Sequence, residues 1–367
     1  MAARSLEEIK EDIRSRIGHR APFIYTDKNE SEEALAKLKS VEPEPWAQAW
    51  GRLGARWEDK ARSEEAAGNL PSAQEAYLKA YGYYGIARHP FPNSPGKKEA
   101  YRKTCEMYLA AARFLNPPLE RVAIPFSGKE IAGYLRLPEK RPAPLIMHWG
   151  GIDNWKEERH SFAESFLKEG WGCFVMDSPG TGECPVLASP EAHQVHSAAL
   201  DYLSKRAEID ARRIAVVGAS FGGYWATKMA HVEHQRLCAV VNWGGGIHYF
   251  FQPEWQEKSR NAPSYLFDLI EARANLFGMK TFEELVRVMP ALSLKTQGWL
   301  DKPCAPLLLI NGKEDKQVPL EDFYLLLESG QPKTARLFPG GHMGNSPEIF
   351  STILKWLHRM LGGAIWG

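Results

Sequence analysis

Residues 213–223 read RIAVVGASFGG, and this stretch decides the fold. It holds the pattern G-x-S-x-G at Gly218, Ser220 and Gly222, directly after an apolar strand-like run and directly before a helical pattern that begins near Phe221. The glycines leave room for a sharp turn between strand and helix, which holds the serine oxygen out above the edge of a sheet. The pattern alone is common in a chain with 31 glycines, so the flanking strand and helix carry the argument. They predict Ser220 as the nucleophile of a hydrolase.

A triad acid is expected downstream of the serine. A serine hydroxyl is a poor nucleophile until a base takes its proton, and a carboxylate must orient that base. In enzymes whose serine lies in such a turn between strand and helix, the acid and the base follow the serine in the order Asp, His. Residues 306–319, PLLLINGKEDKQVP, place Asp315 just past an apolar strand. Glu314 is the neighbouring alternative, but the spacing to Val318-Pro319 favours Asp315.

The base is predicted from residues 337–345, LFPGGHMGN. His342 stands there in a glycine-rich loop, after the last strand-like run and before the closing helical pattern. Most of the other histidines sit in charged or helical patterns, where surface roles are the better prediction. His342 alone has the position that the mechanism requires.

Backbone N–H groups are expected to hold the oxyanion that forms when a serine attacks a carbonyl. The N–H of Phe221 is one candidate, because it follows the nucleophile at a helix N-terminus, where the helix dipole adds partial positive charge. This fold takes its second donor from the loop after an earlier strand, here after residues 145–149, LIMHW. Gly151 and Ile152 are therefore the candidates for the second donor.

Two domains are predicted from the change of pattern along the chain. Residues 1–117 are helical in pattern, whereas strand-like and helical runs alternate over 118–367. The alternation predicts an α/β-hydrolase fold, a mostly parallel sheet with helices on both faces. We expect residues 1–117 to form a helical N-terminal cap domain and 118–367 the catalytic domain. A helical insertion around 248–300, rich in aromatic residues, would roof the active site.

Composition argues against several classes of partner. With 46 Lys+Arg against 45 Asp+Glu the formal charge is +1. The sequence therefore has no excess of positive charge of the kind that binds nucleic acid or an anionic membrane. The sequence has no run of about 18 apolar residues for a membrane span, and its first residues lack the apolar core of a secretory signal. We therefore expect a cytoplasmic protein. The five cysteines form no CxxC pair and have no matching histidine spacing, so no metal site is expected.

Four stretches together resemble one known family. They are residues 148–158 (HWGGIDNWKEE), 218–226 (GASFGGYWA), 310–319 (INGKEDKQVP) and 339–345 (PGGHMGN). With the helical first third, they are similar to the cap-bearing α/β-hydrolases that include dihydroxypseudooxynicotine hydrolase, fungal polyketide-shortening hydrolases and FrsA-like esterases. The resemblance spans nearly the whole chain. It implies a helical cap, a small-molecule carbonyl substrate, no cofactor, and pairing into a homodimer, as helical caps of this family commonly do.

The resemblance also singles out Asp153. In the nicotine-degrading member, an acidic residue after two glycines assists cleavage of a carbon–carbon bond next to a ketone. Asp153 holds that place here, within Gly150-Gly151-Ile152-Asp153. It is an auxiliary acid candidate on this interpretation. The alternative is an N-cap for the helix that starts near Trp155, a role that aspartate fills well.

Two reactions suit the same triad. The first is hydrolysis of the carbon–carbon bond beside the carbonyl of an aromatic or polyketide-type ketone, and the second is carboxylesterase, lactonase or amidase activity. A non-catalytic binding protein on this fold is a third hypothesis, against which the intact order of Ser, Asp and His argues. The mechanism calls for neither a metal nor an organic cofactor.

Aromatic side chains near the motifs are candidates for the lining of a substrate pocket, although aromatics in such numbers are more often core. The candidates are Trp149, Trp155, Tyr224, Trp225, Trp243, Tyr84 and Phe91.

Overall fold

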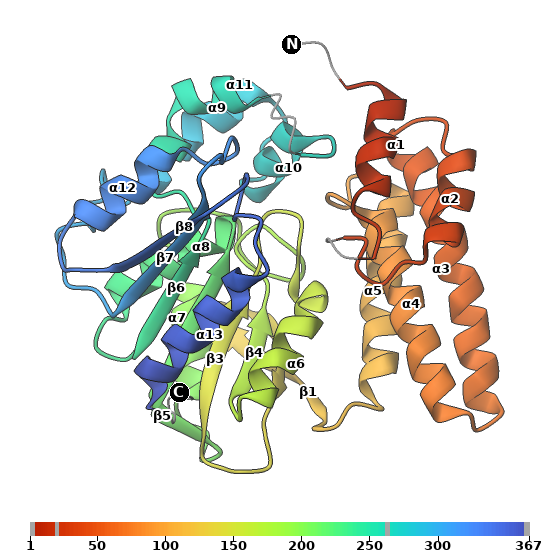
Figure 1. The fold of residues 1–367 in the computed structure, drawn as a ribbon, viewed down its shortest axis with the longest axis horizontal. Helices are drawn as coiled ribbons and strands as arrows, with labels where there is room; N and C mark the ends of the chain where they lie inside the picture. The colour runs from red at the N-terminus through yellow and green to blue at the C-terminus, as the bar shows by residue number, and fades with distance from the viewer. Residues whose placement is uncertain (1–3, 19–21, 261–264, 363–367) are drawn as a thin grey trace. The chain divides into compact units, whose positions relative to one another are not determined.

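The computed structural model describes residues 4–18, 22–260 and 265–362, and it divides into two compact units (Figure 1). The first unit comprises residues 1–119 with 265–269, and the second comprises 120–264 with 270–367. Parts of the predicted cap domain, insertion and C-terminus lie outside the described residues, namely 1–3, 19–21, 261–264 and 363–367.

The first unit is built from helices. They are α1 (Leu6–Arg14), α2 (Lys28–Lys37), α3 (Pro43–Ala66), α4 (Leu70–Arg88) and α5 (Pro95–Ala112). The three long helices each carry a proline in the first turn, at Pro43, Pro71 and Pro95. A proline suits that position because the N–H it lacks would have no partner inside the helix.

Aromatic side chains fill the core of the first unit. Trp46, Trp50 and Tyr83 are fully buried, and Trp50 stacks on Tyr83 with ring centroids 6.5 Å apart. The indole N–H of Trp46 donates to the carbonyl of Ile86 at 2.7 Å, so the polar atom of this buried ring is satisfied. Phe267 lies in residues 265–269, the later stretch of chain that belongs to the first unit, and it packs edge-on against Trp46 with centroids 4.7 Å apart.

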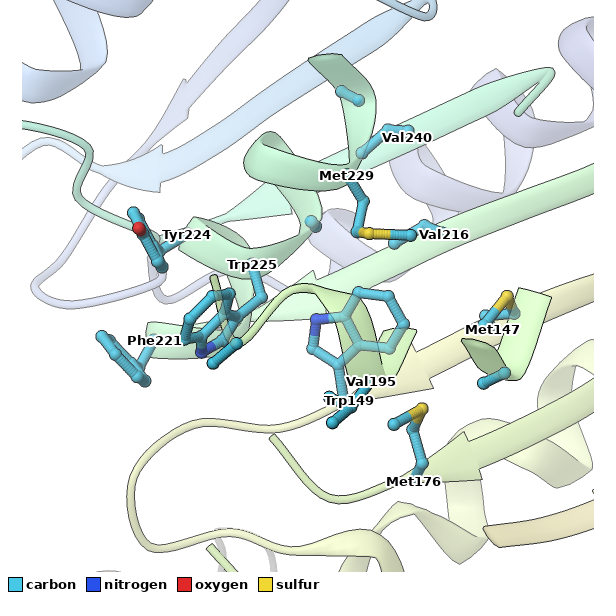
Figure 2. Close-up of a cluster of buried hydrophobic side chains, with 14 of the residues drawn as sticks. Met147, Trp149, Met176, Val195, Val216, Phe221, Tyr224, Trp225, Met229 and Val240 are labelled. Atoms are coloured by element: carbon cyan, nitrogen blue, oxygen red, sulfur yellow. The ribbon is translucent and has the colours of Figure 1, made fainter. Parts of the chain in front are cut away.

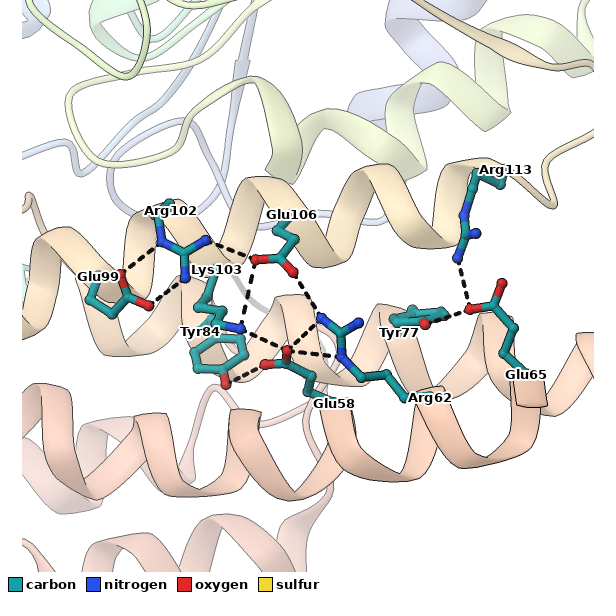
Figure 3. A network of polar contacts seen from close by, with 10 residues as sticks. All are labelled: Glu58, Arg62, Glu65, Tyr77, Tyr84, Glu99, Arg102, Lys103, Glu106 and Arg113. Carbon is teal, nitrogen blue, oxygen red and sulfur yellow. Dashed lines mark hydrogen bonds and ion pairs between the residues drawn. The ribbon is translucent and has the colours of Figure 1, made fainter. Parts of the chain in front are cut away.

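An ion-pair network joins the three long helices of the first unit (Figure 3). Glu58 on α3 accepts hydrogen bonds from Tyr84 Oη on α4 at 2.8 Å and from Lys103 Nζ on α5 at 2.7 Å. Arg62, one turn along α3, pairs with Glu58 at 2.9 Å and with Glu106 of α5 at 2.8 Å. The Glu58 side chain is only 9% exposed, so this part of the network is screened little by solvent.

The second unit is built on an eight-stranded sheet with the order β1-β2-β4-β3-β5-β6-β7-β8. The strands are β1 (Leu119–Phe126), β2 (Lys129–Arg136), β3 (Ala143–Trp149), β4 (Gly172–Met176), β5 (Ile209–Ala219), β6 (Ala239–Trp243), β7 (Leu307–Gly312) and β8 (Thr334–Phe338). The pairs from β4 through to β8 are parallel, whereas β2 runs antiparallel to β4. Every residue of β3 and β7 is buried, as a parallel strand covered on both faces requires.

Helices cover both faces of this sheet, which confirms the predicted α/β-hydrolase fold (Figure 1). The helices of the second unit are α6 (His160–Lys168), α7 (Gln194–Leu203), α8 (Phe221–Val232), α9 (Pro253–Ser259), α10 (Leu269–Leu276), α11 (Phe282–Val288), α12 (Leu320–Glu328) and α13 (Glu348–Leu361). Neighbouring residues of β3 point to opposite faces. His148 meets Phe162 of α6 at 5.0 Å between centroids, and Trp149 meets His196 of α7 at 4.2 Å.

The segment between β6 and β7 contains α9, α10 and α11 with two short 3₁₀ turns, η2 (Tyr249–Phe251) and η3 (Met289–Leu292). Buried Asp322 anchors its start, since its carboxylate accepts the backbone N–H groups of His248 and Tyr249, both at 2.8 Å. None of the helices in the described ranges is both long enough and apolar enough to cross a membrane.

Candidate active site

Ser220 stands in the turn between β5 and α8, with φ 55° and ψ −127°. This positive φ is strained for a serine, and the close approach around it explains the glycines of the motif. A Cβ on Gly218 would lie 2.1 Å from the carbonyl oxygen of Gly222. The turn is tied to the next strand, because Ser220 N–H donates to the carbonyl of Trp243 at 2.7 Å.

His342 lies beside the serine, on the loop after β8. The distance from Ser220 Oγ to His342 Nε2 is 2.8 Å. The loop holds its shape through Met343, whose φ is 68° and whose carbonyl accepts the indole N–H of Trp243 at 2.7 Å. The His342 side chain is 9% exposed, which leaves a small solvent-facing edge.

Asp315 completes a chain of hydrogen bonds from the turn after β7. Its Oδ2 lies 2.8 Å from His342 Nδ1, and its side chain is fully buried. Burial by itself raises the pKa of Asp315, but the charge and hydrogen bond of His342 and the N–H of Val318 outweigh it and hold that pKa below its usual range. Asp315 is therefore a carboxylate at neutral pH. Glu314, which the sequence offered as the alternative triad acid, is exposed.

Both predicted sources of oxyanion donors lie at the serine. Phe221 is the first residue of α8, and the N–H at that position has no partner within the helix. A Cβ on Gly151 would lie 2.9 Å from Ser220 Cβ and 3.0 Å from its Oγ. The loop that holds Gly151 and Ile152 thus touches the nucleophile through a residue without a side chain.

Polar groups after β4 hold this loop, and sequence reasoning missed them. Ser178 Oγ donates to the carbonyl of Gly150 at 3.2 Å, and the N–H of Lys156 donates to Asp177 at 2.8 Å. The buried Lys156 ammonium also pairs with Asp177 at 2.9 Å and with Glu157 at 2.7 Å. The one feature of the sequence that could have indicated these contacts is the run Lys-Glu-Glu at residues 156–158, within the family-like stretch 148–158. Lys156 and Glu157 of this run belong to a buried ion-pair network that fixes the end of the loop.

Asp153 is half-buried in the same loop. The first turn that follows is a 3₁₀ helix, η1 (Lys156–Arg159), and its N-cap is Trp155, whose N–H donates to the carboxylate of Glu158. The helix-cap interpretation of Asp153 is therefore wrong. Its interpretation as an auxiliary acid stays a prediction.

Three of the aromatic pocket candidates lie in the main core of the second unit (Figure 2). Trp149, Tyr224 and Trp225 are fully buried, and Trp149 donates its indole N–H to the carbonyl of Gly222 at 2.8 Å. This bond holds Gly222, which lies two residues after Ser220. Their place in a substrate pocket stays a prediction.

The remaining candidates lie in three different surroundings. Trp243 contacts the His342 loop through the hydrogen bond to Met343, and Trp155 is 3% exposed and donates to the carbonyl of Ile152 at 3.2 Å. Tyr84 and Phe91 belong to the first unit, where Tyr84 donates to Glu58.

Comparisons with known proteins point the same way as the fold. A family described as "Esterase FrsA-like" matches residues 8–359. The chain is 25% identical over 336 residues to "Esterase FrsA" of Photobacterium profundum, an alignment that covers 89% of this chain and 79% of the relative. It is 27% identical over 291 residues to "Esterase FrsA" of Yersinia pestis, covering 77% of this chain and 69% of the relative.

Two solved structures are similar to this chain over more than nine-tenths of its length. The 2,6-dihydroxy-pseudo-oxynicotine hydrolase is 25% identical with a TM-score of 0.78, over 93% of this chain and 96% of that one. AbyA5 is 22% identical with a TM-score of 0.78, over 98% and 96% of the two chains, and shows a likeness of fold alone. These similarities identify an enzyme of the hydrolase class, and the resemblance read from the four motifs is confirmed.

Proposed function

This chain belongs to the FrsA-like esterase family, and we propose that it is a serine hydrolase in which Ser220, His342 and Asp315 form the catalytic triad. The observation that carries the proposal is the continuous chain of contacts from Ser220 Oγ through His342 to Asp315, with both links at 2.8 Å. Nucleophile, base and orienting acid at these distances are the arrangement that activates a serine hydroxyl.

The reaction begins when Ser220 Oγ attacks the carbonyl carbon and its proton passes to His342 Nε2. Negative charge moves to the carbonyl oxygen, where the N–H of Phe221 and an N–H of the Gly151–Ile152 loop stabilise it. The tetrahedral intermediate collapses, the leaving group takes a proton, and an acyl-serine remains. Water, deprotonated by His342, then attacks the acyl group and releases a carboxylic acid and free Ser220. Asp315 stays ionised and keeps the imidazole in the required tautomer.

We propose that the bond broken joins the carbonyl carbon of a ketone to its neighbouring carbon. The leaving group is then a carbanion or enol. It takes its proton either from His342 directly or from Asp153, which then regains a proton from His342, so that His342 is neutral again when water attacks. Two observations support this: a half-buried carboxyl group lies in the loop that touches Ser220, and the 25% identical 2,6-dihydroxy-pseudo-oxynicotine hydrolase covers nearly the whole chain.

Hydrolysis of a carboxylic ester, lactone or amide is the second candidate. The family and both curated relatives carry the name esterase, which favours it. An alkoxide or amine leaving group needs only the proton on His342, so Asp153 would have no part.

A cap domain formed by residues 1–117, the pairing into a homodimer and a cytoplasmic place of action complete the proposal. The cap and the homodimer rest on the family resemblance, and the place of action rests on the apolar pattern of the sequence.

Covalent labelling tests the nucleophile directly. A fluorophosphonate probe should add one adduct to the wild-type protein, mapped by peptide mass spectrometry to Ser220, and none to Ser220→Ala. Ser351→Ala, an exposed serine on α13, is the matched control and should label like the wild type. Labelling that survives in Ser220→Ala would contradict the proposal. A panel of aryl ketones, β-diketones, esters, lactones and amides, followed by product analysis, then identifies the bond.

A further inference from the structure

Asn311 is a buried side chain at the end of β7 that the mechanism has not used. It is 3% exposed, and its amide makes three hydrogen bonds. Nδ2 donates to Asp315 Oδ2 at 2.9 Å, while Oδ1 accepts the N–H of Gly312 at 2.8 Å and the N–H of Met343 at 3.0 Å. One side chain therefore contacts the acid and the residue that follows the base.

The contact with Asp315 fixes the carboxylate. Asp315 Oδ2 receives both the Asn311 amide and His342 Nδ1, and Oδ1 receives the N–H of Gln317 at 2.8 Å and of Val318 at 3.0 Å. Donors on both oxygens hold the plane of the carboxylate, and with it the direction of the oxygen that faces the imidazole. A hydrogen bond to an ionised acceptor is about twice as strong as one between neutral groups.

The contact with Met343 fixes the loop that carries the base. His342 sits between Gly341 and Met343, and Met343 has a positive φ of 68°, a strained conformation for a residue with a side chain that surrounding contacts must hold. Asn311 holds the N–H of Met343, and Trp243 holds its carbonyl at 2.7 Å. An amide is suited to this place because it carries a donor for the carboxylate and an acceptor for the loop, whereas an aspartate has no donor when ionised.

A second buried asparagine, on the neighbouring strand, offers a matched control for Asn311. Asn242, near the end of the neighbouring strand β6, is also 3% exposed. Its amide donates to Thr227 Oγ1 at 2.9 Å and to the carbonyl of Gly245 at 3.0 Å, and accepts the N–H of Gly245 at 2.7 Å. It makes as many hydrogen bonds as Asn311, but these three reach neither Asp315 nor His342.

We propose that Asn311 is a positioning residue that sets His342 and Asp315 relative to each other for proton transfer from Ser220. This inference rests on the proposed function. It predicts that the amide acts on the chemical step, because the relative position of base and acid matters when the serine proton moves and has little bearing on how substrate binds.

The experiment compares Asn311→Ala with Asn242→Ala in the full chain, using p-nitrophenyl acetate for turnover and a fluorophosphonate probe for the rate of labelling. Both variants should lose thermal stability. For Asn311→Ala we expect kcat and the labelling rate to fall about ten- to a hundredfold with KM nearly unchanged, the size of effect that one lost hydrogen bond to a charged group produces. For Asn242→Ala we expect both rates to stay within about threefold of the wild type.

The nearly isosteric pair Asn311→Leu and Asn242→Leu covers the case in which the alanine variants do not fold. Asn311→Leu removes the donor to Asp315 and the acceptor for Gly312 and Met343 without adding a charge beside Asp315, so the same fall in both rates is expected. Equal losses at the two positions, or a change in KM alone, would overturn the inference. Ser220→Ala separates the two proposals: if it still labels, the triad assignment has failed. If it does not label while the Asn311 variants react at the wild-type rate, only the positioning role has failed.

Discussion

Ser220 Oγ lies 2.8 Å from His342 Nε2, although 122 residues separate the two in the chain. The sheet brings them together. The strands β5, β7 and β8 are parallel, so their carboxyl ends lie at one edge. Ser220, Asp315 and His342 each follow one of these strands, and in open α/β sheets this edge is where ligands bind.

Asp315→Asn should lower kcat by roughly a thousandfold or more, because a neutral amide no longer holds the imidazole in the tautomer that accepts the serine proton. Glu314→Gln is the matched control, since it removes a neighbouring exposed carboxylate with the same chemical change. Steady-state kinetics on the best substrate of the panel checks both. A large loss in Glu314→Gln beside an active Asp315→Asn would reverse the assignment.

Gly151→Ala should depress turnover by about a hundredfold, in the range seen when an oxyanion donor is lost. The added methyl group would lie 3.0 Å from Ser220 Oγ, so the loop or the serine must move. Gly51→Ala, a helical glycine with open space around its Cβ position, should leave turnover unchanged. Circular dichroism should show both variants folded. Full activity of Gly151→Ala would mean that the donor lies elsewhere in the loop.

The fold and the three residues of the Ser220 hydrogen-bond chain could be predicted from the sequence because their signals are local. An apolar strand, G-x-S-x-G and a helical pattern stand together around Ser220, and Asp315 and His342 each follow an apolar run at the place that a parallel sheet requires. The structure brings the three side chains to hydrogen-bond distance. Their catalytic roles stay predictions until the variants are measured.

The supports of the site could not be predicted in the same way, because they depend on residues far apart in the sequence. Nothing local indicates that Asn311 reaches Met343, or that Asp177 binds Lys156. The cap interpretation of Asp153 failed for a similar reason. The following turn is a 3₁₀ helix that starts from Trp155, with Glu158 bonded to the Trp155 N–H.

Lys97→Met should raise the melting temperature at pH 7 by several degrees. Lys97 lies in the first turn of α5 and is fully buried, and within the described part of the chain its Nζ has no hydrogen-bond partner. Burial lowers the pKa of Lys97 to about 8 from its usual 10.5. The ammonium is thus disfavoured in the folded state, and the positive end of the helix dipole disfavours it further.

The gain should depend on pH. The unfolded chain binds this proton more tightly, so the penalty of Lys97 is fully present below about pH 8 and disappears as the pH rises to 10.5. The advantage of Lys97→Met should shrink over that window in calorimetric scans. Lys103→Met on the same helix should instead destabilise, because Lys103 pairs with Glu58 at 2.7 Å. A pH-independent gain would show that packing, rather than charge, explains the effect.

Asp153→Asn separates the two candidate chemistries. An alkoxide leaving group is within reach of the proton on His342, whereas a carbanion from a ketone needs a proton at carbon, from a donor on another side of the broken bond. If Asp153 is that donor, the substitution should lower carbon–carbon cleavage by roughly a hundredfold, within the usual range for general acid–base catalysis. Hydrolysis of p-nitrophenyl acetate should survive. Glu158→Gln is the control for damage to the loop, since Glu158 bonds the N–H of Trp155 and should affect both reactions together. Equal loss of both reactions in Asp153→Asn would make Asp153 a support of the loop, and no loss in either would leave ester hydrolysis as the better assignment.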